Sequence, residues 1–152
     1  MVKLSMDKKL SEFIQTVIKD SPYYSRWAKK DESKRFSSQS LRKELKKKDN
    51  LYLTTRTNGK IIGAVNGCYE AGTFWIDWLV VDEKNRRNGI GQGLMKRLEN
   101  RLKREGVHKI WRDSRTSNKE SKSLLTKLGY KRITTIKKHW YKQDFILWQK
   151  FL

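Results

Sequence analysis

Six residues near the middle of the chain have the composition of an anion-binding loop. Residues 86–91 read Arg-Arg-Asn-Gly-Ile-Gly and follow an apolar run that ends at Val81. Glycine lets a backbone approach a ligand closely, and the N–H groups at the start of a helix attract negative charge. The segment lacks a dinucleotide fingerprint, because Leu94 stands at its last glycine position, and it lacks the Gly-Lys-Ser/Thr of a P-loop. It therefore predicts a diphosphate cradle of another kind, although a plain strand-to-helix turn would contain the same glycines.

Asp77 is the second residue whose type and place suggest chemistry. It stands inside the apolar run Phe-Trp-Ile-Asp-Trp-Leu-Val-Val of residues 74–81, where an ionised carboxylate is costly. A free alkylamine has a pKa near ~10 and must lose a proton before it attacks an acyl carbon, so a carboxylate can serve as a base or as an anchor for the amine. An ion pair with one of the many lysines and arginines explains Asp77 equally well.

Composition limits what kind of protein this can be. The chain has 152 residues, 36% hydrophobic and 34% charged, so we expect one globular domain over residues 1–152. A single cysteine and two histidines exclude an internal disulfide and a cysteine-rich zinc site, and we expect no metal. No apolar run approaches the roughly 20 residues of a membrane span, so we expect no membrane association. The sequence shows no segment of signal-peptide type, so we expect a cytoplasmic protein.

The formal net charge of +20 is large for a chain of this length. One explanation is an acidic partner, such as a phosphorylated cofactor, RNA or an acidic protein. A lysine-rich proteome explains the charge equally well. A basic enzyme would repel a polyamine, which mildly favours an acidic or nucleic-acid-associated partner.

The spacing of apolar residues predicts the elements that position these groups. Residues 1–5 suggest a short leading strand. The polar stretch from residue 25 to Phe36 has no clear hydrophobic pattern. Asn58-Gly59 predicts a hairpin turn, and the helix between two strands predicts a mixed sheet. Helices are expected over residues 7–19, from a cap at Ser38 or Ser40 to residue 48, and over 89–105 and 118–128; strands over 51–57, 60–69, 73–81, 107–113, 130–135 and 145–152.

Two motifs in this order resemble those of the GNAT superfamily of acetyl-CoA-dependent N-acetyltransferases. The resemblance covers residues 79–130, which is about a third of the chain. The first motif is Leu79-Val80-Val81, Arg86-x-x-Gly89-x-Gly91 and Leu94; the second, which resembles N-x-x-A-x-x-L-Y-x-K-L-G-F, is Asn118, Ser121, Leu124 and Leu128-Gly129-Tyr130.

The resemblance implies an α/β (α+β) GNAT fold, with a mixed, mostly antiparallel sheet of about six or seven strands and about four flanking helices. It implies that backbone N–H groups of residues 87–91 hold the pyrophosphate of acetyl-CoA and that residues 79–81 pair with the pantetheine arm. Asn118 would contact that arm, cap its own helix, or do both. The implied cofactor-binding residues are Leu79, Val80, Val81, Arg86, Arg87, Asn88, Gly89, Ile90, Gly91 and Asn118.

The implied reaction is acetyl transfer to a primary amine of a protein N-terminus, a lysine or a small molecule. The amine attacks directly through a tetrahedral intermediate, whose oxyanion is stabilised by a backbone N–H near Val80 or Val81. Asp77 is the candidate base. Leu125 stands where the family often has its tyrosine acid, which leaves Tyr141 as the candidate acid and Tyr130 as a core residue.

The acceptor pocket of the family is built from the first two helices and the loop before the last strand. Aromatic residues there can enclose an amine or simply fill the core. The oligomeric state is left open, with a homodimer among the alternatives. An alternative function is a catalytically weak GNAT-fold module that docks on nucleic acid through its basic surface. The aromatic candidates are Tyr23, Tyr24, Trp27, Trp140 and Tyr141.

Overall fold

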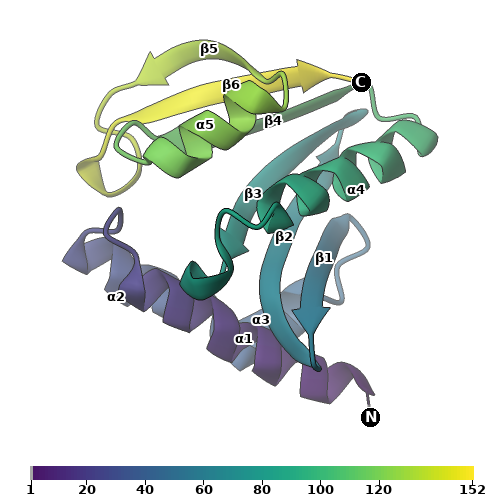
Figure 1. Ribbon diagram of the computed structural model, residues 1–152, viewed down its shortest axis with the longest axis vertical. Coiled ribbons are helices and arrows are strands. Elements are labelled where there is room, and N and C mark those ends of the chain that lie inside the picture. The colour runs from purple at the N-terminus through teal and green to yellow at the C-terminus, as the bar shows by residue number, and fades with distance from the viewer. Residues whose placement is uncertain (1) are drawn as a thin grey trace.

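Six strands, five α-helices and two short 3-10 turns follow one another in the part of the chain that the structure describes (Figure 1). The structure is a computed structural model; it describes the backbone of residues 2–152 and the side chains of residues 8–152. The elements are α1 (Val2–Asp20), α2 (Arg26–Arg35), α3 (Ser38–Glu44), β1 (Asn50–Thr57), β2 (Lys60–Glu70), β3 (Thr73–Val81), η1 (Glu83–Asn85), α4 (Ile90–Arg104), β4 (Lys109–Arg115), α5 (Lys119–Lys127), β5 (Lys131–Ile136), η2 (Trp140–Lys142) and β6 (Phe145–Phe151).

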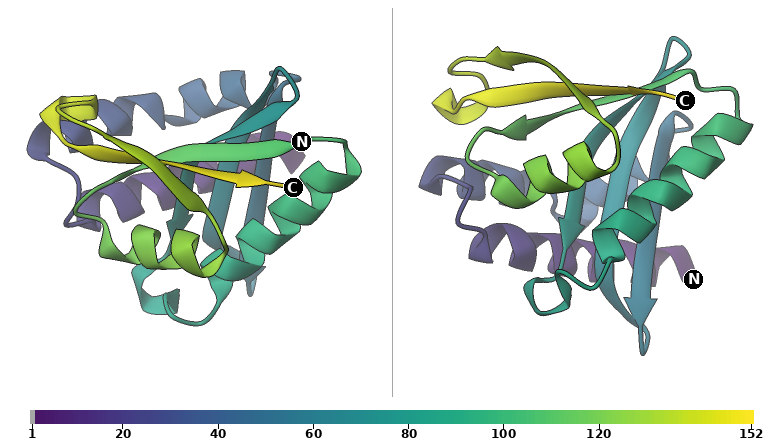
Figure 2. Two further views of the ribbon diagram at one scale, coloured as in Figure 1. Left: turned by 90° about the horizontal axis from the view of Figure 1, so that it is seen from above. Right: turned by 45° about the horizontal axis from the view of Figure 1, so that its top comes forward.

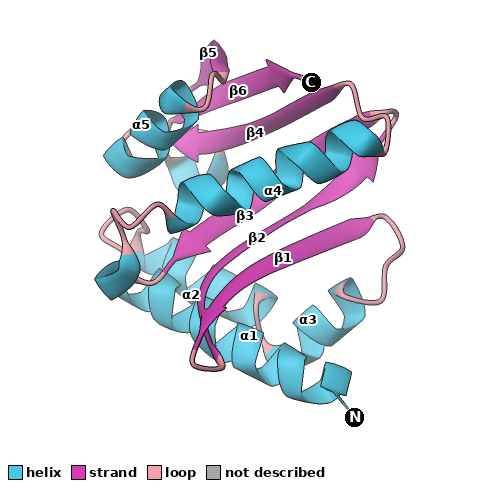
Figure 3. Ribbon diagram, turned by 45° about the vertical axis from the view of Figure 1, so that its right-hand side comes forward, coloured by secondary structure: helices cyan, strands magenta, loops and turns pink. Residues whose placement is uncertain are grey.

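The strands form one sheet in the order β1-β2-β3-β4-β6-β5, in which the last strand lies between β4 and β5 (Figure 3). Only β3 and β4 pair in parallel, and the other four pairings are antiparallel. The α4 helix connects these two strands, as expected for a parallel crossover. The predicted mixed, mostly antiparallel sheet is therefore confirmed, as is the α+β class.

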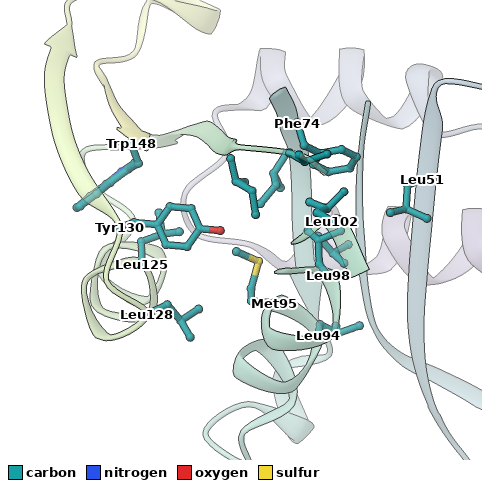
Figure 4. Close-up of a cluster of buried hydrophobic side chains, with 14 of the residues drawn as sticks. Leu51, Phe74, Leu94, Met95, Leu98, Leu102, Leu125, Leu128, Tyr130 and Trp148 are labelled. Atoms are coloured by element: carbon teal, nitrogen blue, oxygen red, sulfur yellow. The ribbon is translucent and has the colours of Figure 1, made fainter. Parts of the chain in front are cut away.

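Helices cover both faces of the sheet (Figure 2). On one face, α4 and α5 pack on a cluster of buried side chains that includes Phe74, Ile110 and Trp148 (Figure 4). On the other face, α1 and α3 pack on a second cluster that includes Ile14, Leu41 and Trp78. None of the helices in the described part of the chain combines the length and apolarity that a bilayer crossing needs.

The first 50 residues differ most from the sequence prediction. The expected strand at residues 1–5 is wrong for residues 2–5, which belong to α1, while Met1 lies outside the described residues. A helix satisfies its backbone internally, whereas a strand there would need a neighbouring strand. The next predicted helix ends at Glu44 instead of residue 48, and its cap is Ser37, whose hydroxyl accepts the Ser40 N–H at 3.3 Å.

The α2 helix was not predicted at all. Its only buried residue is Ala28, so it has no apolar stripe of the kind that reveals a helix in a sequence. Its N-terminal signal is Ser25, whose hydroxyl accepts the Ala28 N–H at 3.2 Å. From β1 onward the strands and helices follow one another along the chain as predicted, and the expected loop before β6 contains the short turn η2.

Candidate active site

The parallel strands β3 and β4 pair over only three residues of each strand and then separate (Figure 3). Thr73, Phe74 and Trp75 are paired with Lys109, Ile110 and Trp111. Beyond them, residues 76–81 of β3 and residues 112–115 of β4 have no ladder between them. This leaves one side of the β3 backbone available for hydrogen bonds to a ligand.

A β-bulge at Asp77 accompanies the separation. Asn66 pairs with Trp78 and Gly67 with Ile76, so Asp77 is the extra residue on β3. The bulge also changes which face each residue occupies, because Ile76 packs in the cluster under α4 whereas Trp78 packs in the cluster under α1. A Cβ atom at Gly67 would lie 2.1 Å from the Trp75 carbonyl oxygen, so only glycine fits opposite the bulge.

The start of α4 is an open helix N-terminus near the end of β3. Its cap residue is Gly89, with φ +76°, and no side chain caps the helix. The first helical hydrogen bond runs from the Gly93 N–H to the Gly89 carbonyl at 2.8 Å, so the N–H groups of the preceding four residues have no intrahelical partner. Such a terminus attracts an anion through its free N–H groups and the helix dipole.

The two arginines before this terminus hold different positions. Arg86 donates from Nε to the Val81 carbonyl at 3.2 Å, which ties the loop back to the end of β3. Arg87 is exposed and adopts a left-handed backbone with φ +62°. Asn88 is exposed as well, and Ile90 is half-buried and packs at the edge of the core under α4.

Gly91 of α4 lies next to both α5 and β3. A Cβ atom there would lie 3.3 Å from Leu124 of α5 and 3.6 Å from Val81 of β3. Leu79 packs against the α4 cluster, whereas Val80 is buried in the α1 cluster. The residues predicted to bind the cofactor on β3 and α4 therefore lie around one junction.

Asn118 is the cap of α5. Its Oδ1 accepts the Ser121 N–H at 2.9 Å, which is the structural role considered for it in the sequence. The same helix carries Glu120 in its first turn, which accepts a hydrogen bond from the Tyr23 hydroxyl. That hydrogen bond, followed by the charges of Arg86 and Arg87, lowers the pKa of the Glu120 carboxyl.

The Asp77 carboxylate forms an ion pair with Arg35 of α2. The side chain of Asp77 is 29% exposed and that of Arg35 is 51% exposed. Arg35 also lies 3.6 Å from a carboxylate oxygen of Glu32. The ion pair expected as one explanation of Asp77 is thus present, and its partner comes from the helix that the sequence pattern did not reveal.

Tyr141, in the loop before β6, contacts two acidic residues of α2, of which Glu32 lies beside Arg35. The hydroxyl of Tyr141 lies 2.8 Å from a carboxylate oxygen of Asp31 and 2.9 Å from one of Glu32, and it donates its single proton to one of them at a time. Burial and the bond to Asp31 raise the pKa of Tyr141 above its ordinary value. Tyr141 and Asp77 are therefore linked through Glu32 and Arg35, and Tyr141 holds a left-handed backbone with φ +54°.

The other aromatic candidates spread over this region. Trp27 is 56% exposed, and its ring meets the Tyr141 ring edge-on with centroids 5.4 Å apart. Trp140 is 54% exposed and donates from Nε1 to Asp113 at 2.8 Å. Tyr24 lies under the Arg115 guanidinium, 3.9 Å from its ring centroid. Trp27 and Trp140 are thus exposed, whereas Tyr24 packs between its neighbours.

Comparison with known proteins decides the family. An acetyltransferase of Pectobacterium atrosepticum is 30% identical to the chain over 96 residues, which are 63% of this chain and 68% of the relative. The model of the acetyltransferase (GNAT) family matches residues 16–130. The chain belongs to the GNAT family. It is an acetyltransferase of that family, and the family uses acetyl-CoA.

Solved structures agree with the GNAT fold at low sequence identity. The PaiA N-acetyltransferase of Thermoplasma acidophilum, in complex with coenzyme A, matches with a TM-score of 0.85 and 17% identity over 98% of this chain and 94% of its own. The ribosomal-protein-S18-alanine N-acetyltransferase of Escherichia coli matches with a TM-score of 0.73 and 18% identity over 93% and 86%. At these identities the likeness concerns the fold alone.

The junction of β3, α4 and α5 fits the cofactor of a GNAT enzyme. A diphosphate requires donors, and the uncapped N-terminus of α4 supplies them beside two arginines. Gly91 has no side chain, so the backbone of α4 can come close to its surroundings there. A Cβ atom at this position would already contact Leu124. The unpaired side of β3 supplies the backbone groups for an extended arm.

Leu125 and Tyr130 belong to the core of this GNAT domain (Figure 4). Leu125 is fully buried and Tyr130 is 3% exposed, so the predicted core role of Tyr130 is confirmed. Burial, followed by the charge of Glu99, raises the pKa of the Tyr130 hydroxyl. No phenol therefore stands at the position where the family often has one.

Several charged residues of this region could not be recognised in the sequence. Arg35, Glu32 and Asp31 lie on α2, which showed no hydrophobic period. By contrast, Arg112 of β4, which precedes Asp113, stands between Ile110 and Ser114 on the core face, and this place in the strand alternation could have indicated a buried charge. Burial lowers the pKa of the Arg112 guanidinium.

Proposed function

We propose that this enzyme transfers an acetyl group from acetyl-CoA to a primary amine, with the cofactor at the start of α4 and the amine at Asp77. The observation that carries the proposal is the separation of β3 from β4. Residues 77–81 of β3 carry the Asp77 carboxylate at one end and lead to the open N-terminus of α4 at the other. Donor and acceptor can thus meet along one short strand segment.

The chain's own groups account for cofactor binding. Acetyl-CoA supplies an acetyl thioester when it is bound. Backbone N–H groups of residues 87–91 bind the diphosphate, Arg86 and Arg87 add positive charge, and residues 79–81 offer backbone partners to the arm. Asn118 uses its Oδ1 for the α5 cap, which leaves its amide N–H₂ group as the donor for the cofactor. A backbone N–H near Val80 or Val81 polarises the acetyl carbonyl.

Asp77 is the residue that we assign to the acceptor amine. Its carboxylate already binds one cation, the Arg35 guanidinium. An alkylammonium presents a similar charge and would compete for the same oxygen atoms. Asp77 would anchor the amine and accept its proton before the attack.

Tyr141 is the residue that we assign to the departing sulfur. With a pKa above its ordinary value, its hydroxyl stays protonated at neutral pH. A thiol has a pKa near ~8.5, so complete proton transfer from such a phenol is unfavourable, but a hydrogen bond to the sulfur is not. Tyr141 would therefore stabilise the leaving group as a donor, after leaving Asp31 or Glu32.

The acceptor class follows from the charge of the enzyme. A net charge of +20 favours an amine that is part of an acidic or nucleic-acid-associated partner over a free polyamine. One structural neighbour, by its name, acts on the alanine of a ribosomal protein, and an acceptor of this kind would suit the charge. A protein N-terminus or a lysine in such a partner is the first acceptor to test.

The decisive experiment measures thiol release from acetyl-CoA with a panel of peptide and small amines. We expect Asp77→Asn to lower kcat/KM by about 100-fold or more, because it removes both the amine's anchor and its base. Asp20→Asn, at the exposed end of α1, should leave the rate unchanged. Acetyl-CoA should raise the melting temperature of all three proteins equally. A normal rate in Asp77→Asn would remove Asp77 from the acceptor site.

Tyr141→Phe tests the second assignment. The variant keeps the ring beside Trp27 and removes only the hydroxyl. We expect kcat to fall about tenfold while the affinity for acetyl-CoA stays the same, since a single donor to developing charge has an effect of at least this order. A change in KM for the amine without a change in kcat would instead make Tyr141 a residue that only holds α2 in place.

A further inference from the structure

One row of residues crosses the whole sheet on the face opposite α4 and α5. Successive pairings join Asn50 to Cys68, Cys68 to Trp75, Trp75 to Trp111, Trp111 to Gln149 and Gln149 to Lys131. Directly paired residues in a sheet point to the same face. The row therefore places two tryptophans side by side between polar residues.

The neighbours of these residues identify the face. Phe74 and Ile76 flank Trp75, Ile110 precedes Trp111 and Trp148 precedes Gln149, and all four are buried in the cluster under α4 and α5. Since side chains alternate along a strand, Trp75, Trp111 and Gln149 point the other way. Among the described residues, the cluster under α1 and α3 contains none from β4, β5 or β6. This half of the face is partly exposed, with Lys131 exposed at its edge.

The two tryptophans are held in fixed positions. Their ring centroids lie 5.0 Å apart at an interplanar angle of 81°. The indole N–H of Trp111 donates to the Thr73 hydroxyl at 3.2 Å, which sets the orientation of that ring. A preorganised aromatic ring on an accessible surface loses little entropy when a flat partner stacks on it.

Positive charge lies at the end of the pair opposite Asp77 and Asp113, which stand two residues beyond Trp75 and Trp111 on their strands. The ammonium group of Lys109 lies 5.2 Å from the Trp111 ring centroid. Lys109 pairs with Phe151, which is 67% exposed, and Lys131 ends the row of the two tryptophans. Aromatic rings beside lysines are the surface that a single nucleic-acid strand requires, because bases stack on the rings while phosphates pair with the cations.

We propose that this face binds single-stranded nucleic acid, with a base stacked on the Trp75–Trp111 pair and phosphates at Lys109 and Lys131. A second copy of the chain fits the face less well, since the contact would bring one +20 chain against another. The proposed surface adjoins Asp77 on β3 but uses other residues, and it does not rest on the roles assigned at the acetyl-transfer site.

The test measures the binding of a fluorescently labelled 12-nucleotide oligo-dT strand by anisotropy at several salt concentrations. We expect Trp111→Ala to weaken binding about tenfold, the loss typical of one stacked base. The double variant Lys109→Gln/Lys131→Gln should weaken binding and reduce the magnitude of the salt slope by about two, one for each lost phosphate contact.

Matched controls separate this face from general charge. Lys96→Gln/Lys103→Gln removes the same charge from the exposed side of α4, and Trp27→Ala removes an exposed tryptophan from α2. Both should bind the strand nearly as well as the unchanged protein. Stabilisation by acetyl-CoA should be the same in every variant, which shows that each one is folded.

Three results would overturn the proposal. The first is equal binding of an abasic strand of the same length, which would mean that no base stacks. The second is polyglutamate binding with equal strength and equal loss in Trp111→Ala, which would make this a surface for acidic peptides. The third is a dimer of the protein that Trp111→Ala dissociates while oligo-dT has no effect, which would make it a self-association surface.

Discussion

The cofactor half of the proposed site is made of backbone, whereas its proposed acceptor half is made of side chains. The cofactor half consists of residues 79–91 and Asn118, and its main features are an unpaired strand edge and an uncapped helix N-terminus. The acceptor half consists of Asp77, α2 and residues 137–144, and its main features are ion pairs and hydrogen bonds between charged groups.

This difference indicates which part of the site can change its ligand specificity through single substitutions. A backbone cradle depends on a few glycines and on the geometry of one turn, so it suits a cofactor that stays the same. A network such as Asp77, Arg35, Glu32 and Tyr141 changes with a single substitution, so it suits an acceptor that differs between enzymes. The comparison can be tested by changing each half separately.

Gly67→Ala should have the largest effect, because the bulge opposite Gly67 supports both halves. The added Cβ atom would meet the Trp75 carbonyl oxygen at 2.1 Å and the Phe74 ring at 2.5 Å, and neither can move freely. We expect a loss of about 3 kcal/mol in the free energy of unfolding, measured with urea. The control Gly93→Ala, on α4 with open space around it, should be neutral or slightly stabilising. Equal stability of the two variants would mean that the bulge is not rigid.

Gly89→Ala should damage only the cofactor half. Gly89 has φ +76°, and a Cβ atom added there would have no neighbour within 4 Å, so the substitution adds backbone strain without a clash. We expect the affinity for acetyl-CoA to fall about tenfold, since a left-handed alanine costs roughly 1–2 kcal/mol and the loop would relax away from its binding geometry. Gly59→Ala, with φ +75° in the β1–β2 turn, carries the same strain far from the site and should bind acetyl-CoA normally.

The strand, turn and helix start of the proposed cofactor half could be predicted from the sequence. The order Val81, Arg86, Gly89 and Gly91 is local, and each residue acts through the backbone around its own position. The hairpin at Asn58-Gly59 was predictable for the same reason, and both its residues have positive φ. Local turn chemistry is determined by neighbouring residues, so it can be recognised in one sequence.

The acceptor half could not be predicted, because its contacts join distant segments. Asp77 was recognised as out of place, but nothing in the sequence indicated that Arg35, 42 residues earlier, pairs with it. Tyr141 was named as a candidate, yet its partners Asp31 and Glu32 are about 110 residues away on a helix without an apolar stripe. Ion pairs between segments leave no periodic pattern.

Arg35→Ala should affect only the acceptor half. It frees the Asp77 carboxylate from the cation that now occupies it, so we expect KM for the amine to fall about three- to tenfold while the affinity for acetyl-CoA stays unchanged. Arg35→Lys keeps the charge and should resemble the unchanged enzyme more closely. A higher KM in Arg35→Ala would show that Arg35 binds the acceptor instead of competing with it.

The smallest predicted effect concerns the pH dependence of stability. The proposed acceptor half contains many charged groups, so its stability should change with pH. In the folded protein, burial raises the pKa of the Asp113 carboxyl, against the opposing hydrogen bond from Trp140. In the unfolded chain this carboxyl ionises near pH ~3.9. Between that pH and the higher pKa of the folded state, the unfolded chain holds fewer protons, so stability falls as the pH rises and stays lower above this window.

Asp113→Asn removes that penalty and keeps an oxygen acceptor for Trp140. We expect the variant to be more stable by up to about 1 kcal/mol at pH 7 and to show no gain at pH 3, where Asp113 is protonated in both states. Asp144→Asn, in the same loop region, should have the opposite sign. The Lys138 N–H and Lys137 lower the pKa of Asp144, so its contribution is present above the ordinary pKa and is lost as the pH falls. Urea titrations at the two pH values separate the signs; the same sign for both variants would show that burial and ion pairing do not control this loop.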